Sequence, residues 1–307
     1  MMASSSQNPE FPSGVVATPL PVGILGTGRL ALALGELLRR NGVTVKAVAG
    51  RNPERSTEAA AFMGAATWCG IDELSTRAPL ILISVSDNAI PEMAERLVAC
   101  PVLPQVVLHV SGATGLGVLQ PLQQAGVATG VLHPLQVIPS AERGIETLAG
   151  ATFTCAGDKQ AVEQALLLAR IVGGVPLRID ASQLARYHAA SVMACNYQVV
   201  LMDAALGMFE EAGISREAAL AAMRPIILAN TQNLLNLGPE LALTGPLRRG
   251  DTATLRRHLD ALDTAPPESR RLYLAAAESA LPLARRAGLP AAAADAVASL
   301  LKESRLK

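Results

Sequence analysis

Two histidines stand where a side chain could move a proton. An imidazole titrates near neutrality and can supply the proton that accompanies hydride transfer to a carbonyl or imine. His133 precedes Pro134 at the end of an apolar run, and His188 lies at the start of a long helical stretch. Each also has a structural interpretation: His133 could brace the loop before Pro134, and His188 could pair at a helix or subunit contact. Both are therefore candidate proton donors.

Two other polar residues could orient a substrate beside these histidines. Ser111 follows the strand that contains His109. Asn196 lies about 12 Å beyond His188 along a helix axis, so these two side chains could flank a small molecule. His109 is inside its strand, where we expect a buried structural side chain. Cys195, on the same helix as Asn196, is expected in the core, because hydride transfer needs no thiol nucleophile.

A glycine-rich turn gives the strongest cofactor signal. The turn follows the GxGxxA pattern over Gly26, Thr27, Gly28, Arg29, Leu30 and Ala31. In this fingerprint the first glycine permits a tight turn, and the second lets the backbone approach a pyrophosphate at the helix N-terminus. An ordinary strand-to-helix turn could carry the same glycines. The apolar strand before the turn and the helix after it favour a dinucleotide site.

The loop after the apolar strand Thr44–Ala49 favours NADP over NAD. An NAD site would carry an Asp or Glu there to accept from the ribose 2′-hydroxyl. This loop instead contains Arg51, Asn52 and Arg55. An arginine fork matches a 2′-phosphate, and no carboxylate repels it. The alternative interpretation is that Arg51 is a solvated loop cation.

Another strand end should pass beneath the nicotinamide half of such a cofactor. The apolar run Leu80–Val85 ends on Val85, Ser86 and Asp87. Ser86 and Asp87 also fit the N-cap of the following helix, and the two interpretations can hold together.

The loop Leu243–Thr252 offers a weaker candidate for substrate binding. Thr244 and Arg249 lie in this Gly- and Pro-marked loop, beside Arg248. A guanidinium could hold a substrate carboxylate through two hydrogen bonds. For Asp251 we favour a structural role as the N-cap of the next helix.

The elements that position these residues divide the chain in two. From about residue 20 to 180, short β-rich runs alternate with helical stretches, which is typical of a parallel sheet with crossover helices. The predicted strands are Val22–Leu25, Thr44–Ala49, Leu80–Val85, Val106–Val110, Gly130–Leu132, Thr152–Cys155 and Val175–Ile179. The predicted helices are Leu30–Asn41, Pro53–Met63, Ile90–Val98 and Gln160–Val172. Open sheets of this kind bind ligands outside the carboxyl ends of their strands, where Ser111 and His133 should lie.

Beyond residue 180 only helices are predicted. They are Ser182–Ala212, Ser215–Leu237 with Ser215 as its N-cap, Thr252–Leu262, Pro267–Ala287 and Ala291–Glu303. The expected fold class is thus α/β, with an N-terminal doubly wound, mainly parallel Rossmann domain followed by an all-α domain. We expect a disordered tail over 1–18, the NADP-binding domain over 19–180 and a substrate and dimerisation domain over 181–307.

Composition narrows the possible functions. The 307 residues carry 26 Lys plus Arg and 26 Asp plus Glu, so no charge excess favours nucleic acid or an anionic membrane. We identify no apolar run near the roughly 18–20 residues of a membrane span, and no signal peptide. The four cysteines form no CxxC pair, so we expect neither a metal site nor a disulfide framework. The expectation is a cytoplasmic protein, and its Ala- and Leu-rich helices favour a homodimer.

Five stretches resemble one family. From residue 20 to the C-terminus the chain is similar to Rossmann-plus-DUF2520 proteins. The matching stretches are GILGTGRLA, HVSGATG, LHPLQVIP, YHAASVMACNY and LTGPLRRGDTATLRRHLDAL. The family is similar in build to 6-phosphogluconate dehydrogenase-like enzymes, which include ketopantoate reductase, pyrroline-5-carboxylate reductase and prephenate dehydrogenase.

The resemblance implies roles for several residues. Ketopantoate reductases carry a Lys-x3-Asn-x3-Asn pattern on the first long helix of the second domain, and His188, Val192 and Asn196 fall on those positions. Prephenate dehydrogenases use a Ser and the His of an HP motif, where this chain has Ser111 and His133. The rest of their aromatic-substrate machinery has no counterpart here. The prediction is an NADPH-dependent reductase of a small 2-oxo acid, with ketopantoate in pantothenate synthesis as the first choice. The alternatives are a cyclic imine reductase and a non-catalytic NADPH-binding sensor or scaffold.

Overall fold

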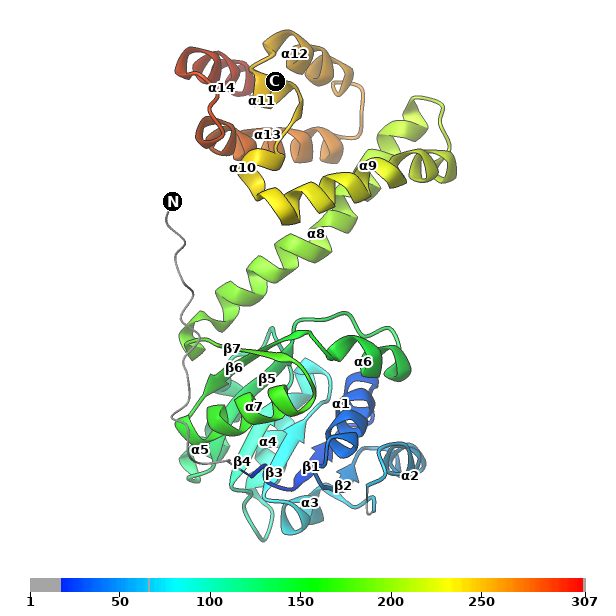
Figure 1. Ribbon diagram of the computed structural model, residues 1–307, viewed down its shortest axis with the longest axis vertical. Coiled ribbons are helices and arrows are strands. Elements are labelled where there is room, and N and C mark those ends of the chain that lie inside the picture. The colour runs from blue at the N-terminus through cyan, green and yellow to red at the C-terminus, as the bar shows by residue number, and fades with distance from the viewer. Residues whose placement is uncertain (1–17, 66, 306–307) are drawn as a thin grey trace. The chain divides into compact units, whose positions relative to one another are not determined.

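The structure, a computed structural model, describes residues 18–65 and 67–305, so the tail predicted over 1–18 lies almost wholly outside them. Within the described residues the chain forms two compact units, one extending to Ser191 and one beginning at Val192 (Figure 1). The first contains the sheet, and no described residue after Arg178 is in a strand. The predicted fold class is confirmed: a mainly parallel sheet with helices precedes a helical region.

Seven strands form the sheet of the first unit. They are β1 (Val22–Leu25), β2 (Val45–Ala49), β3 (Leu80–Ile83), β4 (Val106–His109), β5 (Ala128–Pro134), β6 (Thr152–Gly157) and β7 (Val175–Arg178). Their order is β2-β1-β3-β4-β5-β6-β7, and every neighbouring pair is parallel except β5 with β6. The runs in β1, β3 and β4 are buried throughout, as expected of parallel strands that helices cover on both faces.

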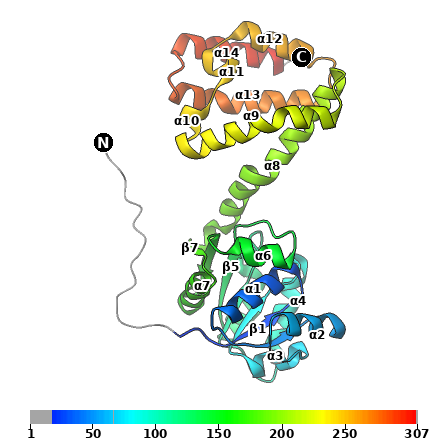
Figure 2. The same ribbon diagram turned by 45° about the vertical axis from the view of Figure 1, so that its right-hand side comes forward.

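Helices cover both faces of this sheet (Figure 1). One face carries α1 (Arg29–Arg40), α2 (Pro53–Phe62) and α7 (Lys159–Ile171). The other carries α3 (Ile71–Arg77), α4 (Ile90–Val98) and α5 (Gln120–Gln124). A further helix, α6 (Ala141–Leu148), lies against α1, where a Cβ on Gly144 would come within 2.7 Å of the Ala33 Cβ (Figure 2). The sequence analysis missed α3, α5 and α6, because each is too short to show a clear helical period.

The sheet has its topological switch point between β1 and β3. The chain leaves β1 for β2 on one side and returns to β3 on the other, so the loops after β1 and β3 diverge above a crevice. Gly26 lies in the turn after β1, close to the end of β3. Its φ is +133°, and a Cβ there would lie 2.1 Å from the Ser84 carbonyl oxygen.

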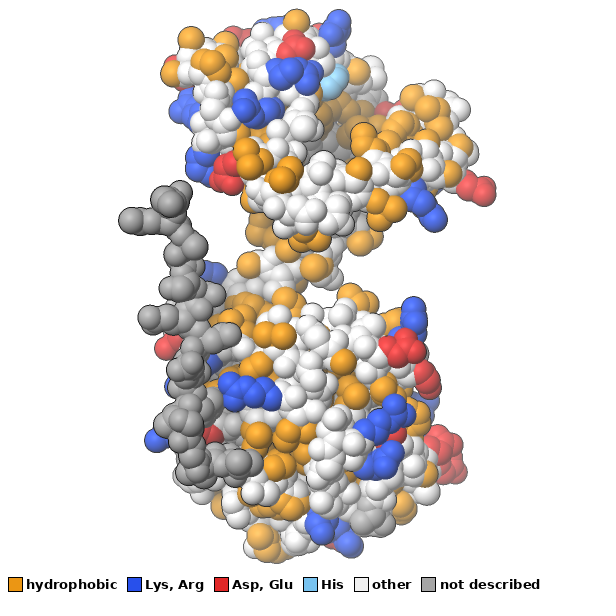
Figure 3. Space-filling model, viewed as in Figure 1, with side chains coloured by type: hydrophobic (Ala, Val, Ile, Leu, Met, Phe, Trp, Pro, Cys, Tyr) orange, Lys and Arg blue, Asp and Glu red, His pale blue; other side chains and the backbone are white. Residues whose placement is uncertain are grey.

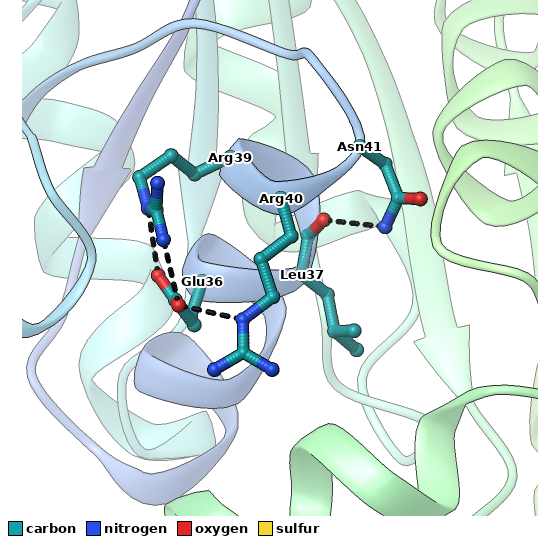
Figure 4. A network of polar contacts seen from close by, with 5 residues as sticks. All are labelled: Glu36, Leu37, Arg39, Arg40 and Asn41. Atoms are coloured by element: carbon teal, nitrogen blue, oxygen red, sulfur yellow. Dashed lines mark hydrogen bonds and ion pairs between the residues drawn. The ribbon is translucent and has the colours of Figure 1, made fainter.

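The C-terminal end of α1 is held by a charged cluster (Figure 4). The buried carboxylate of Glu36 accepts hydrogen bonds from Arg39 and Arg40, at distances between 2.7 and 2.9 Å. The hydrogen bond from Arg39 lowers the pKa of Glu36, against the raising effect of burial. The side chain of Asn41 donates to the Leu37 carbonyl, which closes the last turn. These bonds lie within α1 and its C-cap, and they stabilise the last turns of the helix that begins at the glycine-rich turn.

Helices make up the second unit. They are the continuation of α8 (Leu184–Glu211), then α9 (Arg216–Leu237), α10 (Pro239–Ala242), α11 (Gly245–Arg249), α12 (Thr252–Ala261), α13 (Pro267–Arg286) and α14 (Ala291–Arg305). Residues of α11 to α14 share one apolar core. Ser215 and Asp251 cap α9 and α12 by accepting from backbone N–H groups, as predicted. The segment predicted as a loop before Asp251 instead contains α11, because Pro246 fits its first turn and Gly250 ends it with a φ of +70°.

The second unit exposes many large apolar side chains (Figure 3). They include Val199, Leu201, Ile226, Leu228, Leu235, Leu237 and Leu241, from α8 to α10. Among the described residues, the helical segment Ala181–Glu211 is long and apolar enough, by length and composition, to cross a membrane. That finding corrects our expectation that no stretch approaches such a span. One helix of this kind is weak support for a membrane protein, since core helices of soluble proteins and signal sequences meet the same criterion.

Candidate functional site

An open cleft of about 990 Å³ runs along the carboxyl ends of the strands in the first unit. This volume is at the upper end of the range of small-molecule sites. Ten of the eleven predicted cofactor residues line it: Gly26, Thr27, Gly28, Arg29, Leu30, Arg51, Arg55, Val85, Ser86 and Asp87. Because the sheet order is β2-β1-β3-β4-β5, the lining passes from the loop after β2 across the glycine-rich turn to the loops after β3, β4 and β5.

The glycine-rich turn leaves the start of α1 open to this cleft. Gly28 is the N-cap of α1 and has no side chain to satisfy the first N–H groups of the helix. Unlike at Gly26, a Cβ on Gly28 would have no described atom within 4 Å. The protein's own packing therefore does not require glycine at this position. An open, uncapped helix N-terminus is suited to binding a phosphate, which the partial positive charge there attracts.

Two arginines occupy the β2 end of the cleft. Arg51 and Arg55 are exposed there, and within 18–65 and 67–305 neither forms an ion pair with a carboxylate. Asn52, the predicted cofactor residue outside the lining, caps α2 by accepting from the Arg55 N–H at 2.9 Å. Asn52 therefore has a structural role at the start of α2, the helix that carries Arg55.

The opposite end of the cleft is polar and partly acidic. Ser86 is the N-cap of the 3₁₀ turn Asp87–Ala89, although its hydroxyl makes no capping bond. Ser111 also lines the cleft, and its hydroxyl donates to the Thr114 hydroxyl at 2.9 Å while accepting from backbone N–H groups. These bonds fix the turn after β4.

His109 and His133 lie behind this turn. The His133 Nδ1 is 3.0 Å from the Val110 carbonyl oxygen, which can only accept, so Nδ1 carries a proton and Nε2 is bare in the neutral ring. A Cβ on Gly112 would lie 2.4 Å from that Nε2, so glycine lets the ring edge approach the turn. Burial lowers the pKa of His133, and the neighbouring His188 lowers it further. The hydrogen bond to the Val110 carbonyl and the negative charge of Asp87 act in the opposite direction and raise it.

His109 is fully buried, as predicted for a structural residue. Its Nδ1 accepts from the Ser111 N–H at 3.2 Å, which places the proton of the neutral ring on Nε2. Burial lowers its pKa to about 4. The ring is therefore neutral at physiological pH and holds the backbone of Ser111 without changing charge.

The first turns of α8 bring His188 to His133. The two ring centroids are 6.2 Å apart in an edge-to-face arrangement. The Nδ1 of His188 is buried and has no hydrogen-bond partner among the described residues. The two predicted proton donors, far apart in the sequence, therefore lie together beside the Ser111 turn.

Comparisons with known proteins bear on both halves of the chain. A family of Rossmann-like domains matches residues 6–134, and the "Domain of unknown function (DUF2520)" matches residues 151–280. The chain combines a Rossmann-like domain with a DUF2520 domain. The resemblance stated from the sequence motifs is thus confirmed. The DUF2520 match begins before β6, so it takes in β6, α7 and β7 as well as helices of the second unit.

Solved structures share the fold of this Rossmann-like and DUF2520 chain. A candidate NADP oxidoreductase of Bacteroides fragilis is 23% identical, with 85% of this chain and 97% of that chain covered and a TM-score of 0.65. A Thermotoga maritima protein is 20% identical, with 86% and 98% covered and a TM-score of 0.70. The pyrroline-5-carboxylate reductase of Coxiella burnetii is 15% identical, with 94% and 98% covered and a TM-score of 0.55. At these identities the likeness concerns the fold. No curated protein matches the chain.

Three predicted site residues lie in the second unit, within the DUF2520 match. Asn196, Thr244 and Arg249 are all exposed, and their roles stay predictions. Arg248, beside Arg249, donates to the Ala287 carbonyl and so has a structural role. Cys195, expected in the core, is exposed. That expectation was wrong, because α8 has few buried residues beyond its first turns.

The sequence analysis missed one wall of the cleft in the Rossmann-like domain. Glu92, Met93 and Arg96 line it from α4, and Gln136 and Ile138 from the loop after β5. The spacing of 92, 93 and 96 puts the α4 residues on one helical face, which was the available signal. Within the described parts of the chain no group of His, Cys, Asp and Glu could hold a metal ion.

Proposed function

We propose that this protein is an NADPH-dependent reductase of a small 2-oxo acid, with ketopantoate as the first substrate to test. The observation that supports it best is the cleft itself. It joins two unpaired arginines, an open helix N-terminus and a polar end next to two histidines. Along an NADP molecule the 2′-phosphate, the pyrophosphate and the reactive nicotinamide ring follow one another in the same order.

The proposed cofactor fits the residues present. Arg51 and Arg55 would hold the 2′-phosphate, and the N–H groups after Gly28 would hold the pyrophosphate. Val85, Ser86 and Asp87 would lie under the nicotinamide half. The bound cofactor would supply a hydride to the carbonyl carbon of the substrate. Similar structures include the candidate NADP oxidoreductase of Bacteroides fragilis and a reductive aminase of Aspergillus terreus in complex with NADPH.

The chain's own residues would complete the reduction. As the carbonyl carbon gains the hydride, the π electron pair moves to oxygen, which takes a proton from His188 or, failing that, from His133. Ser111 and Asn196 would orient the substrate, and Thr244 and Arg249 would bind its carboxylate. The product is the 2-hydroxy acid.

A substrate screen tests this function. Purified protein with NADPH should oxidise the cofactor in the presence of at least one member of a panel of 2-oxo acids, with ketopantoate among them. Turnover of cyclic imines alone would favour the second candidate, a reductase of the pyrroline-5-carboxylate type. That candidate is supported by the fold shared with such enzymes and with reductive aminases. NADPH binding without any turnover would favour a sensor or scaffold.

The variant Arg51→Glu should weaken NADPH binding about a hundredfold and NADH binding less than about threefold, because it replaces a phosphate ligand with a like charge. Titration calorimetry with both nucleotides measures the difference. The matched control is Lys46→Glu, an equal change of charge on the exposed face of β2 outside the cleft. Equal losses for the two nucleotides would show that Arg51 does not contact the 2′-phosphate.

The exposed apolar residues of α8 to α10 support a homodimer, because burial of many large apolar side chains against a second copy is favourable. Light scattering at tens of micromolar should give about twice the 31.8 kDa mass of one chain. The double variant Val199→Glu with Leu235→Glu should shift the mass toward one chain, whereas Lys302→Glu should not. A wild-type mass near 32 kDa at that concentration would contradict the dimer.

A cytoplasmic location stays a prediction of the sequence.

A further inference from the structure

Unpaired buried polar atoms are concentrated in one part of the first unit. Five buried side-chain atoms lack a hydrogen-bond partner within the described residues. Four of these are the His109 Nε2, the Thr154 Oγ1, the Tyr187 hydroxyl and the His188 Nδ1. The fifth, the Ser75 Oγ, lies apart on α3. A buried polar group without a partner costs about 1–3 kcal/mol, so four together point to a ligand or water that completes them.

The strand register brings His109, His133 and Thr154 to one face of the sheet. Thr154 on β6 is paired directly with His133 on β5, so their side chains project from the same face. His109 on β4 is paired with Val131, which is two residues before His133 and therefore on that face as well. The first turn of α8 covers the face, since Leu184 packs on Val131 and Ala156. The next turn carries Tyr187 and His188, whose ring reaches His133.

The backbone contacts decide what each histidine can offer. His109 uses Nδ1 to accept from Ser111, so its Nε2 is a donor. His133 uses Nδ1 to donate to Val110, so its Nε2 is an acceptor in the neutral ring. The hydroxyls of Thr154 and Tyr187 can each donate or accept. The cluster therefore presents several donors and an acceptor, which suits a group that makes more than one hydrogen bond.

The cluster contains no Lys or Arg, so only a protonated histidine could give it positive charge. Its members are three histidines, a threonine and a tyrosine. Burial lowers the pKa of both His109 and His133, and the negative charge of Asp87 acts in the opposite direction on both. A carboxylate placed among these side chains would be desolvated, would have no permanent cation as a partner and would be repelled by Asp87. An uncharged carbonyl or imine avoids those costs.

We propose that His109, His133, Thr154, Tyr187 and His188 form a subsite that receives the uncharged carbonyl or imine group of the substrate. The protein groups that contact the substrate group directly are the hydroxyls of Tyr187 and Thr154. The subsite rests on the proposed reductase function and deepens it, because it assigns the reacting carbonyl or imine and the carboxylate of the substrate to different groups of the protein. The carboxylate of a 2-oxo acid must then be held by a cation outside this cluster.

Two conservative variants test the subsite in the full-length protein. Tyr187→Phe and Thr154→Val each remove a hydroxyl that has no hydrogen-bond partner in the part of the chain that the structure describes, so neither should lower the melting temperature. Binding is measured by ligand-observed NMR in the presence of NADP⁺, which prevents turnover. The probes are 2-oxobutanoate and butanoate, which differ in the oxo oxygen. Each variant should weaken 2-oxobutanoate binding about tenfold and leave butanoate and NADPH affinity unchanged. The control, Tyr197→Phe, changes an exposed tyrosine of the same helix and should leave all three unchanged.

The outcomes separate this subsite from the proposed function. Unchanged 2-oxobutanoate affinity in both variants overturns the subsite, and so does an equal loss of butanoate binding. Failure of the wild-type chain to bind 2-oxobutanoate or 1-pyrroline at millimolar concentration overturns it as well. Binding that depends on the hydroxyls, without turnover of any substrate with NADPH, supports the subsite and refutes the reductase. Normal turnover in both variants supports the reductase and refutes the subsite.

Discussion

Replacement of His188 by alanine should lower kcat about 10²–10⁴-fold and leave NADPH affinity nearly unchanged. The structure gives two reasons. The Nδ1 of His188 is buried and has no hydrogen-bond partner within residues 18–65 and 67–305, so the ring is not committed to holding the fold. The neighbouring His133 is committed, through its bond to the Val110 carbonyl and its contact with Gly112. Steady-state kinetics with NADPH and the best substrate of the screen measure the change, and fluorescence titration measures cofactor affinity.

His133→Ala should lower kcat/KM by a smaller factor than His188→Ala does, chiefly by raising KM, if His133 positions the substrate or the ring of His188. The control is His258→Ala, which removes a histidine that contacts Tyr273 in the second unit and should leave activity unchanged. An inactive His133→Ala beside a normal His188→Ala would reverse the two roles. Full activity in both variants would exclude both histidines as the acid and leave Ser111 or a bound water.

The pH profile separates the two donors further. A general acid must be protonated, so the rate of reduction falls as pH rises through the pKa of the donor. Burial lowers the pKa of His133 below the usual value for histidine. If His133 were the donor, kcat would therefore decline at a pH below about 6.5 and stay low above it. The decline should disappear in His133→Ala if that assignment holds.

Much of the first unit could be predicted because its strands are short apolar runs between recognisable turns. The strands Val22–Leu25 and Val175–Arg178 begin where the sequence analysis placed them, and β5 extends a few residues beyond its prediction. The short helices α3 and α6 were missed because their stability comes from packing on neighbours such as Ala33, which the local sequence does not encode.

The cofactor cleft was also largely predictable, since one rule places the carboxyl ends of parallel strands along one edge. The polar cluster around His133 was not. Thr154 joins it only because β6 runs antiparallel to β5 in a register that pairs Thr154 with His133. Tyr187 joins it through the packing of Leu184 on the sheet. Neither pairing leaves a signal in residue types or spacing.

The two glycines of the turn should respond to substitution in opposite ways. Gly26→Ala should destabilise the protein by about 3 kcal/mol or more, because φ is +133° and the new Cβ would lie 2.1 Å from the Ser84 carbonyl oxygen. Gly28→Ala should leave the melting temperature nearly unchanged, because no described atom lies within 4 Å of its Cβ position.

Among the variants that fold, NADPH affinity should fall most for Gly28→Ala, the substitution that affects stability least. The Cβ of Gly28→Ala would occupy the space through which the pyrophosphate approaches α1, so NADPH affinity should fall at least about tenfold. Thermal denaturation and nucleotide titration on the same samples measure both effects. Gly115→Ala is the control, since its Cβ position is also open and lies outside the cleft lining. Wild-type NADPH affinity in Gly28→Ala would mean that no phosphate binds at the start of α1, and the cofactor assignment would then fail with it.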